Sequence, residues 1–167
     1  GGEPLLQMDF LTEFFKKAKA EGVHTNLDTS GNPFTDQEPW HSGWLELMKY
    51  TDLVMLDIKQ IDEQEHIKLT GHSNKNILAM ARELSDMKKP VWIRRVLVPG
   101  GSDKDEYLHR LADFIHTLSN VERVEVLPYH TLGKFKWENL GLSYPLEGVN
   151  PPTQERIDNA RKILGAI

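Results

Sequence analysis

Four groups of polar residues follow short apolar stretches of the chain, and each has its own chemistry. Asp28 could accept hydrogen bonds from ribose hydroxyls or from an ammonium group. Asp57 comes two residues before Lys59, whose compact charge pairs with a carboxylate or a phosphate. Arg94 has a planar fork that suits a carboxylate or a peptide carbonyl, and His130 could stack on a base or exchange a proton near neutral pH. Together these residues predict a pocket for a charged ligand.

Each group also has a purely structural interpretation. Asp28 could cap the turn that follows it, and Asp57 with Lys59 could form an ion pair at the end of a strand. Arg94 and Arg95 are adjacent, so on a strand they point to opposite faces, and we expect one of them to be a surface residue.

Other residues of interest have structural explanations that are at least as good. The segment Pro99-Gly100-Gly101-Ser102 could hold an anion before a helix, but a turn with a serine N-cap explains it equally well. The remaining histidines lack metal-ligand spacing and are expected to be solvated, among them His41, His66, His72, His109 and His116. The tryptophans are expected to pack in the core or at its edge: Trp40, Trp44, Trp92 and Trp137.

Composition limits the classes of function. The chain has 167 residues, of which 39% are hydrophobic, as expected for one folded domain. Its net charge of −5 argues against a general nucleic-acid or anionic-membrane binder. The sequence has neither a membrane-spanning apolar run nor a signal-like start, which predicts a cytoplasmic protein. Because cysteine is absent, these residues offer no disulfide, thiolate zinc site, cysteine nucleophile or cysteine-bound iron–sulfur cluster.

The pattern of apolar residues predicts the scaffold that positions the polar groups. Apolar runs at 53–58 and 91–98 are typical of strands buried on both faces of a parallel sheet, and shorter strands are expected at 23–27 and 121–127. Helices are expected at 10–20, 40–49, 76–88, 103–118 and 153–164, with a long loop at 128–152. The alternation predicts one α/β domain over residues 1–167, with ligands at the carboxyl ends of the strands.

Several segments, taken in order, resemble one family. They are GGEPLLQ at 1–7, GVHTNLDTSG at 22–31, TDLVMLDIKQ at 51–60, VWIRRV at 91–96, VPG at 98–100, VLPYH at 126–130, LGK at 132–134 and GVNPP at 148–152. The combination closely resembles the glycyl-radical-enzyme activases of the radical S-adenosylmethionine (SAM) superfamily, in particular pyruvate formate-lyase-activating enzymes. The resemblance implies a partial (β/α)6 TIM-like barrel, of which this chain supplies about the last four strands.

In that family a 4Fe-4S cluster, held by a CxxxCxxC loop, reduces SAM, and the resulting 5′-deoxyadenosyl radical takes a hydrogen atom from a glycine of the target enzyme. The matching motifs imply the residues that contact SAM. Gly2 and Glu3 are expected at its amino group, and Asp28 at its amino or ribose groups. Further contacts are expected from Asp57, Ile58 and Lys59, with Lys59 toward the carboxylate, and from His130 beside the nucleoside.

The resemblance also implies sites for other partners. Arg94, with Asp57 and His130, is expected to position the glycine-bearing peptide. A monovalent cation is expected near hard donors at Asp28, Thr29, Met55 and Asp57. The implied protein partners are pyruvate formate-lyase and an electron donor such as flavodoxin or ferredoxin, with neither nucleic acid nor membrane.

The sequence departs from the family pattern in one respect, because it contains no CxxxCxxC loop. We therefore expect that residues before Gly1 supply the cluster loop and that this chain alone is inactive. Two alternatives stay open, an activase of a different glycyl radical enzyme and a noncatalytic barrel-like binding domain. The coding sequence before Gly1 would distinguish them.

Overall fold

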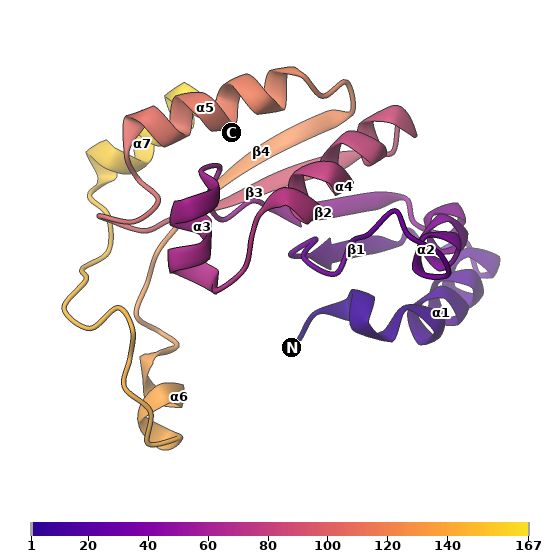
Figure 1. Ribbon diagram of the computed structural model, residues 1–167, viewed down its shortest axis with the longest axis horizontal. Coiled ribbons are helices and arrows are strands. Elements are labelled where there is room, and N and C mark those ends of the chain that lie inside the picture. Colours follow the sequence, from indigo (N-terminus) through magenta and orange to yellow (C-terminus); the bar gives the residue numbers. More distant parts are fainter. Residues whose placement is uncertain (1, 167) are drawn as a thin grey trace.

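The computed structural model describes residues 2–166, which build a four-stranded sheet covered by helices. The strands are β1 (Asn26–Thr29), β2 (Leu53–Asp57), β3 (Val91–Leu97) and β4 (Val121–Pro128). They lie in the order β1-β2-β3-β4, and every neighbouring pair is parallel. Because spatial order follows chain order, each connection crosses over the sheet and carries at least one helix (Figure 1). The predicted α/β class with a parallel sheet is confirmed.

Five helices agree with the predicted ranges to within two residues at either end, and three were not predicted. The helices are the 3-10 helix η1 (Pro4–Gln7), α1 (Met8–Ala20), α2 (Trp40–Lys49), α3 (Glu63–Thr70), α4 (Lys75–Asp86), α5 (Asp105–His116), α6 (Lys134–Asn139) and α7 (Gln154–Leu164). The three that were not predicted are η1, α3 and α6. The unpredicted α3 buries only His66, and the unpredicted α6 buries none of its residues. Neither therefore has the apolar stripe by which a helix is found in a sequence. Within residues 2–166, no helix is both long enough and apolar enough to span a membrane.

The first strand lies later in the chain than the predicted range of 23–27. Thr25 is held at the start of the strand, because its hydroxyl donates to the carbonyl of Tyr50 at 2.5 Å and its backbone N–H donates to the Asp52 carboxylate at 2.9 Å. Pairing with β2 begins only at Asn26. Asp28 thus belongs to the strand itself and does not cap a turn, as one interpretation of the sequence suggested.

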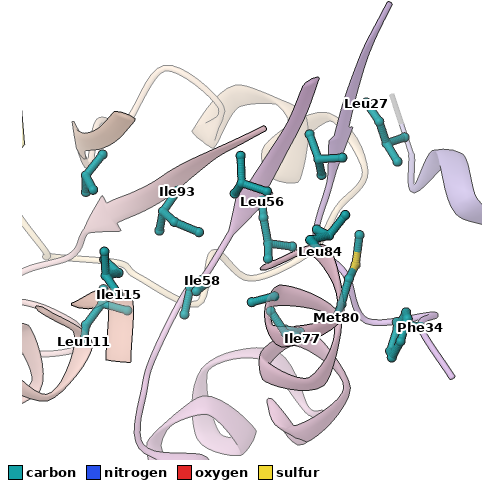
Figure 2. Packing of buried hydrophobic residues seen from close by; sticks show 14 of the residues in the cluster. Leu27, Phe34, Leu56, Ile58, Ile77, Met80, Leu84, Ile93, Leu111 and Ile115 are labelled. Atoms are coloured by element: carbon teal, nitrogen blue, oxygen red, sulfur yellow. The ribbon is translucent and has the colours of Figure 1, made fainter. Parts of the chain in front are cut away.

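One face of the sheet is apolar and packs against helices. Leu27, Leu56 and Ile93 project from β1, β2 and β3 into a core shared with α4 and α5 (Figure 2). At the end of β1 the chain turns at Gly31, which has a φ of +71°, and a Cβ there would lie 2.8 Å from Cδ1 of Leu56. The turn therefore requires glycine both for its backbone conformation and for its contact with the core.

The other face of the sheet is polar and partly exposed. Side chains alternate along each strand, so residues two apart share a face. The strand register aligns Asp28, Met55 and Trp92 in one row of this face and Asp57, Arg94 and Glu125 in the next. The sheet thus brings together on this face three of the residues singled out in the sequence for their charge, Asp28, Asp57 and Arg94.

Candidate ligand-binding site

A cavity of about 590 Å³ lies at the carboxyl ends of β1 and β2. Its walls include six residues predicted for the site: Gly2, Glu3, Asp28, Thr29, Asp57 and Lys59. Leu11 and Phe15 of α1 supply an apolar wall. Four other predicted residues, Met55, Ile58, Arg94 and His130, are not part of this lining. Gly1, which belongs to the predicted glycine-glycine-glutamate segment, lies outside the described residues.

The Glu3 carboxylate accepts hydrogen bonds from neighbouring groups of the same chain. Its Oε1 accepts from the backbone N–H of Leu5 at 3.2 Å and from the Thr29 hydroxyl at 2.5 Å. Its Oε2 accepts from the backbone N–H and the hydroxyl of Ser30, at 2.9 and 2.6 Å. These four hydrogen bonds cap η1 and fasten the segment before α1 to the end of β1, so the side chain of Glu3 has a structural role beside the cavity.

Asp57 and Lys59 form a pair at the end of β2. Nζ of Lys59 donates to Oδ2 of Asp57 at 2.7 Å, and the Lys59 side chain keeps 39% of its surface exposed. The second oxygen of Asp57, Oδ1, is buried and has no hydrogen-bond partner within the described residues. The pair thus offers a partly exposed ammonium group beside a carboxylate oxygen that lacks a partner in the described residues.

Arg94 reaches across β2 to Asp28. Its Nη1 donates to Oδ2 of Asp28 at 2.7 Å, and its Nε lies 3.6 Å from Oε2 of Glu125 on β4. Glu125 is shared with Arg123, whose Nε lies 3.1 Å away and whose guanidinium stacks over the Trp92 ring. Charged side chains of alternating sign therefore lie next to one another across the polar face from β1 to β4, in the order Asp28, Arg94, Glu125 and Arg123.

Arg95 contradicts the expectation that one of the two arginines lies at the surface. Its side chain does point away from that of Arg94, but it is 0% exposed on the helix-covered face. There it donates hydrogen bonds to the carbonyls of Ile58, Lys59 and Ser102. Burial lowers the pKa of Arg95 to about 10. A charged side chain is tolerated in this core because backbone carbonyls surround it.

His66 was wrongly expected to be solvated. It is 2% exposed, and its Nδ1 lies 2.7 Å from the carbonyl of His72, to which it donates. The reason is that α3 has no apolar stripe, so no helix that would bury this ring could be predicted. His41 is half-buried and lies 2.9 Å from Glu83, which also accepts from the buried Trp44.

The remaining predicted residues lie outside the cavity lining. His130 is exposed after the end of β4, directly following the buried Tyr129. Ile58 is fully buried and continues β2 through a hydrogen bond to the carbonyl of Arg94. Within residues 2–166 there is no group of three His, Cys, Asp or Glu side chains that could hold a metal ion. The cation near Asp28 and Met55 stays a prediction.

Sequence comparison places this geometry in a family. The model of the radical SAM superfamily matches residues 1–114, and the chain belongs to that superfamily. Over 164 residues it is 56% identical to the pyruvate formate-lyase-activating enzyme of Streptococcus mutans and 57% identical to that of Staphylococcus epidermidis. Each match covers 98% of this chain but only 62% and 65% of those relatives, so the chain spans slightly less than two thirds of their length.

Solved structures agree with this assignment. A domain of pyruvate-formate lyase-activating enzyme from Bacteroides vulgatus superposes with a TM-score of 0.78 at 25% identity, covering 99% of this chain and 89% of that domain. A radical SAM methyltransferase from Sphaerobacter thermophilus shares the fold, with a TM-score of 0.56 at 19% identity over 87% of this chain and 39% of its own. The expected partial barrel of the radical SAM type is confirmed.

The superfamily implies two groups, SAM and a 4Fe-4S cluster, and the residues present fit only the first. The chain has no cysteine and therefore no thiolate ligand for a cluster. The cavity does suit the charged amino-acid part of SAM. The ammonium group of Lys59 could pair with the SAM carboxylate, and the neighbouring Asp57 has a carboxylate oxygen without a partner in the described residues.

Proposed function

We propose that this chain is the SAM- and substrate-binding portion of a pyruvate formate-lyase-activating enzyme. In this proposal a CxxxCxxC segment elsewhere in the same polypeptide binds the cluster, which receives electrons from a flavodoxin or ferredoxin in the cytoplasm. In the whole polypeptide, bound SAM with a reducing cluster would supply methionine and a 5′-deoxyadenosyl group, and the latter would remove a hydrogen atom from a glycine of pyruvate formate-lyase. Residues 1–167 are the carboxyl-terminal part of the barrel domain and are inactive alone. The identity of 56% over 98% of the chain carries the proposal.

The proposed SAM site uses residues at the ends of β1 and β2. Lys59 leaves Asp57, 2.7 Å away, and pairs with the SAM carboxylate. Asp28 accepts hydrogen bonds from the amino or ribose groups once Arg94 releases it, and Ile58 supplies backbone contacts. The segment of Gly2 and Glu3 meets the amino group through its backbone, since the Glu3 carboxylate already has four donors.

The proposed peptide site lies on the polar face of the sheet. Arg94 is aligned with Asp57 in the strand register, so both side chains face the same space. The guanidinium of Arg94 holds a carbonyl of the glycine-bearing loop, while His130 lies between this loop and the nucleoside. A monovalent cation held by Asp28, Thr29, Met55 and Asp57 would balance the two carboxylates.

Substitution of Lys59 tests the proposal. In a polypeptide that joins this chain to a cluster-binding segment, Lys59→Ala should weaken SAM binding by about 10- to 100-fold, the usual effect of losing one charged hydrogen bond. Isothermal titration with SAM measures the affinity, and iron content should not change. Lys75→Ala is the matched control, because Lys75 is 75% exposed and pairs only with Glu63 in the described chain. Equal SAM affinity for Lys59→Ala and wild type would refute the site.

A further inference from the structure

Arg95 is the largest charged side chain buried in the described core, and all its hydrogen bonds go to backbone carbonyls. Nη1 donates to the carbonyls of Lys59 at 2.7 Å and Ile58 at 3.3 Å, and Nη2 donates to the carbonyl of Ser102 at 2.5 Å. An apolar side chain of similar size would fill the same space without the desolvation cost of a guanidinium. The hydrogen bonds to these two loops are thus what distinguishes arginine at this position.

The first of these loops joins β2 to α3 and carries Lys59. Its next residues are held from the other side, because Nδ2 of Asn74 donates to the carbonyls of Gln60 at 3.0 Å and Ile61 at 2.8 Å. Gln60 in turn donates through Nε2 to the carbonyl of Gly101 at 3.3 Å. The backbone around Lys59 is therefore fixed at several points, although the Lys59 side chain itself is partly exposed.

The second loop joins β3 to α5 and is equally constrained. Ser102 is 0% exposed, and its hydroxyl accepts from the N–H of Val98 and donates to the carbonyl of Val96. Arg95 thus connects two rigid loops at the carboxyl ends of neighbouring strands. A shift of either loop would break hydrogen bonds in a region that water does not reach, which is unfavourable.

We propose that Arg95 is a positioning residue for ligand binding, because it fixes the backbone from which Lys59 projects into the cavity without touching the ligand itself. The inference rests on the proposed function, in which Lys59 pairs with the carboxylate of SAM. Placement of the ammonium group within a fraction of an ångström matters because a charged hydrogen bond weakens steeply as its geometry departs from the optimum. Removal of Arg95 should therefore weaken SAM binding through Lys59.

The test combines affinity with local exchange. Arg95→Met should weaken SAM binding about tenfold in the cluster-containing polypeptide, measured by titration calorimetry. In this chain alone, amide hydrogen exchange should become faster at residues 58–62 and stay unchanged in β4. Arg95→Lys keeps the charge and at least one donor, so its SAM affinity should lie between those of wild type and Arg95→Met. If Arg95→Met does not fold, Arg95→Lys takes its place in the test.

The decisive measurement is the double variant. If Arg95 acts through Lys59, Arg95→Met should cause no further loss of SAM affinity once Lys59→Ala is present. Ile115→Ala, at the far end of α5, removes buried apolar contacts and is the control for general destabilisation. Additive losses in the double variant, or an equal loss of affinity in Ile115→Ala, would overturn the inference.

Two further outcomes separate this inference from the function on which it rests. Wild-type affinity in Arg95→Met together with weak binding in Lys59→Ala would overturn the role of Arg95 and leave the proposed function standing. Wild-type affinity in Lys59→Ala would overturn both.

Discussion

Replacement of Glu3 by alanine should destabilise the fold, although the family resemblance places this residue beside a ligand. The Glu3 carboxylate accepts four hydrogen bonds, from Leu5, Thr29 and both polar groups of Ser30. These bonds close a loop between residues 26 positions apart, which ties η1 to the end of β1. In Glu3→Ala the segment before α1 would lose both its cap and its attachment to the sheet.

The size of the effect follows from the kind of hydrogen bonds. Loss of a helix N-cap costs about 1 kcal/mol. A hydrogen bond to a charged group contributes about 1.5–3 kcal/mol, but Glu3 and Ser30 are half-buried, so water replaces part of what is lost. We expect Glu3→Ala to lower the free energy of unfolding by about 2–4 kcal/mol, which for a chain of this length lowers Tm by roughly 5–15 °C.

Urea unfolding followed by far-UV circular dichroism measures this change. Glu3→Gln keeps one acceptor oxygen but presents an amide N–H₂ to donors, so its loss should be about half as large. Glu13→Ala is the control, because Glu13 is 66% exposed and lies 3.8 Å from Lys16 in a pair that contributes little. If the free energy of unfolding of Glu3→Ala lies within about 0.5 kcal/mol of that of Glu13→Ala, the Glu3 carboxylate does not stabilise the fold. Contact with the ligand then becomes the better explanation for a glutamate at this position.

Three more substitutions test other parts of the structure. The hydrogen bond from Lys19 lowers the pKa of Asp52 from 3.8 to about 2. The ionised Asp52 carboxylate therefore stabilises the fold above pH 3.8, and this stabilisation is lost as the pH falls toward 2. In a plot of the urea unfolding midpoint against pH, Asp52→Asn should remove the change between these two pH values. Gly31→Ala should cost about 1–3 kcal/mol of unfolding free energy in the same assay, since its Cβ would press on Leu56, and a wild-type midpoint would contradict the close approach. Arg94→Met should change stability by less than about 1 kcal/mol but slow glycyl radical formation on the target by roughly 100-fold, as followed by electron paramagnetic resonance. Its SAM affinity should be no weaker than that of wild type, because Asp28 is then free of its ion pair with Arg94; a wild-type rate would remove Arg94 from the peptide site.

The sheet and most helices were predictable because their sequences carry a strong physical signal. The runs 53–58 and 91–98 are mostly apolar, which predicts strands of a parallel sheet. The expectation that both of their faces are buried is wrong, because helices cover one face and the other carries Asp57 and Arg94. By contrast, α3 was missed because Ile67 and Leu69 are exposed at 38% each, while the one residue that it buries is a histidine. Such a helix is stabilised by its neighbours and not by an amphipathic pattern.

The candidate site was partly predictable for a similar reason. Asp28, Asp57 and Lys59 share the cavity because the carboxyl ends of parallel strands meet at one edge of a sheet. The roles of Glu3 and Arg95 were not predictable. Glu3 finds its partners 26 and 27 residues along the chain, and Arg95 is buried where strand alternation alone cannot tell a helix-covered face from an open one.

The segment that carries α6 makes the protein divisible into two pieces. Between 131 and 152 the chain stands apart from the sheet and exposes Lys136 to proteases (Figure 1). After a cut there by trypsin, α7 would still pack against α5 and β4, and Arg156 would still pair with Asp105. The nicked protein should therefore migrate as one species on a native gel and as two bands after denaturation, and mixing of the separated pieces should restore the whole.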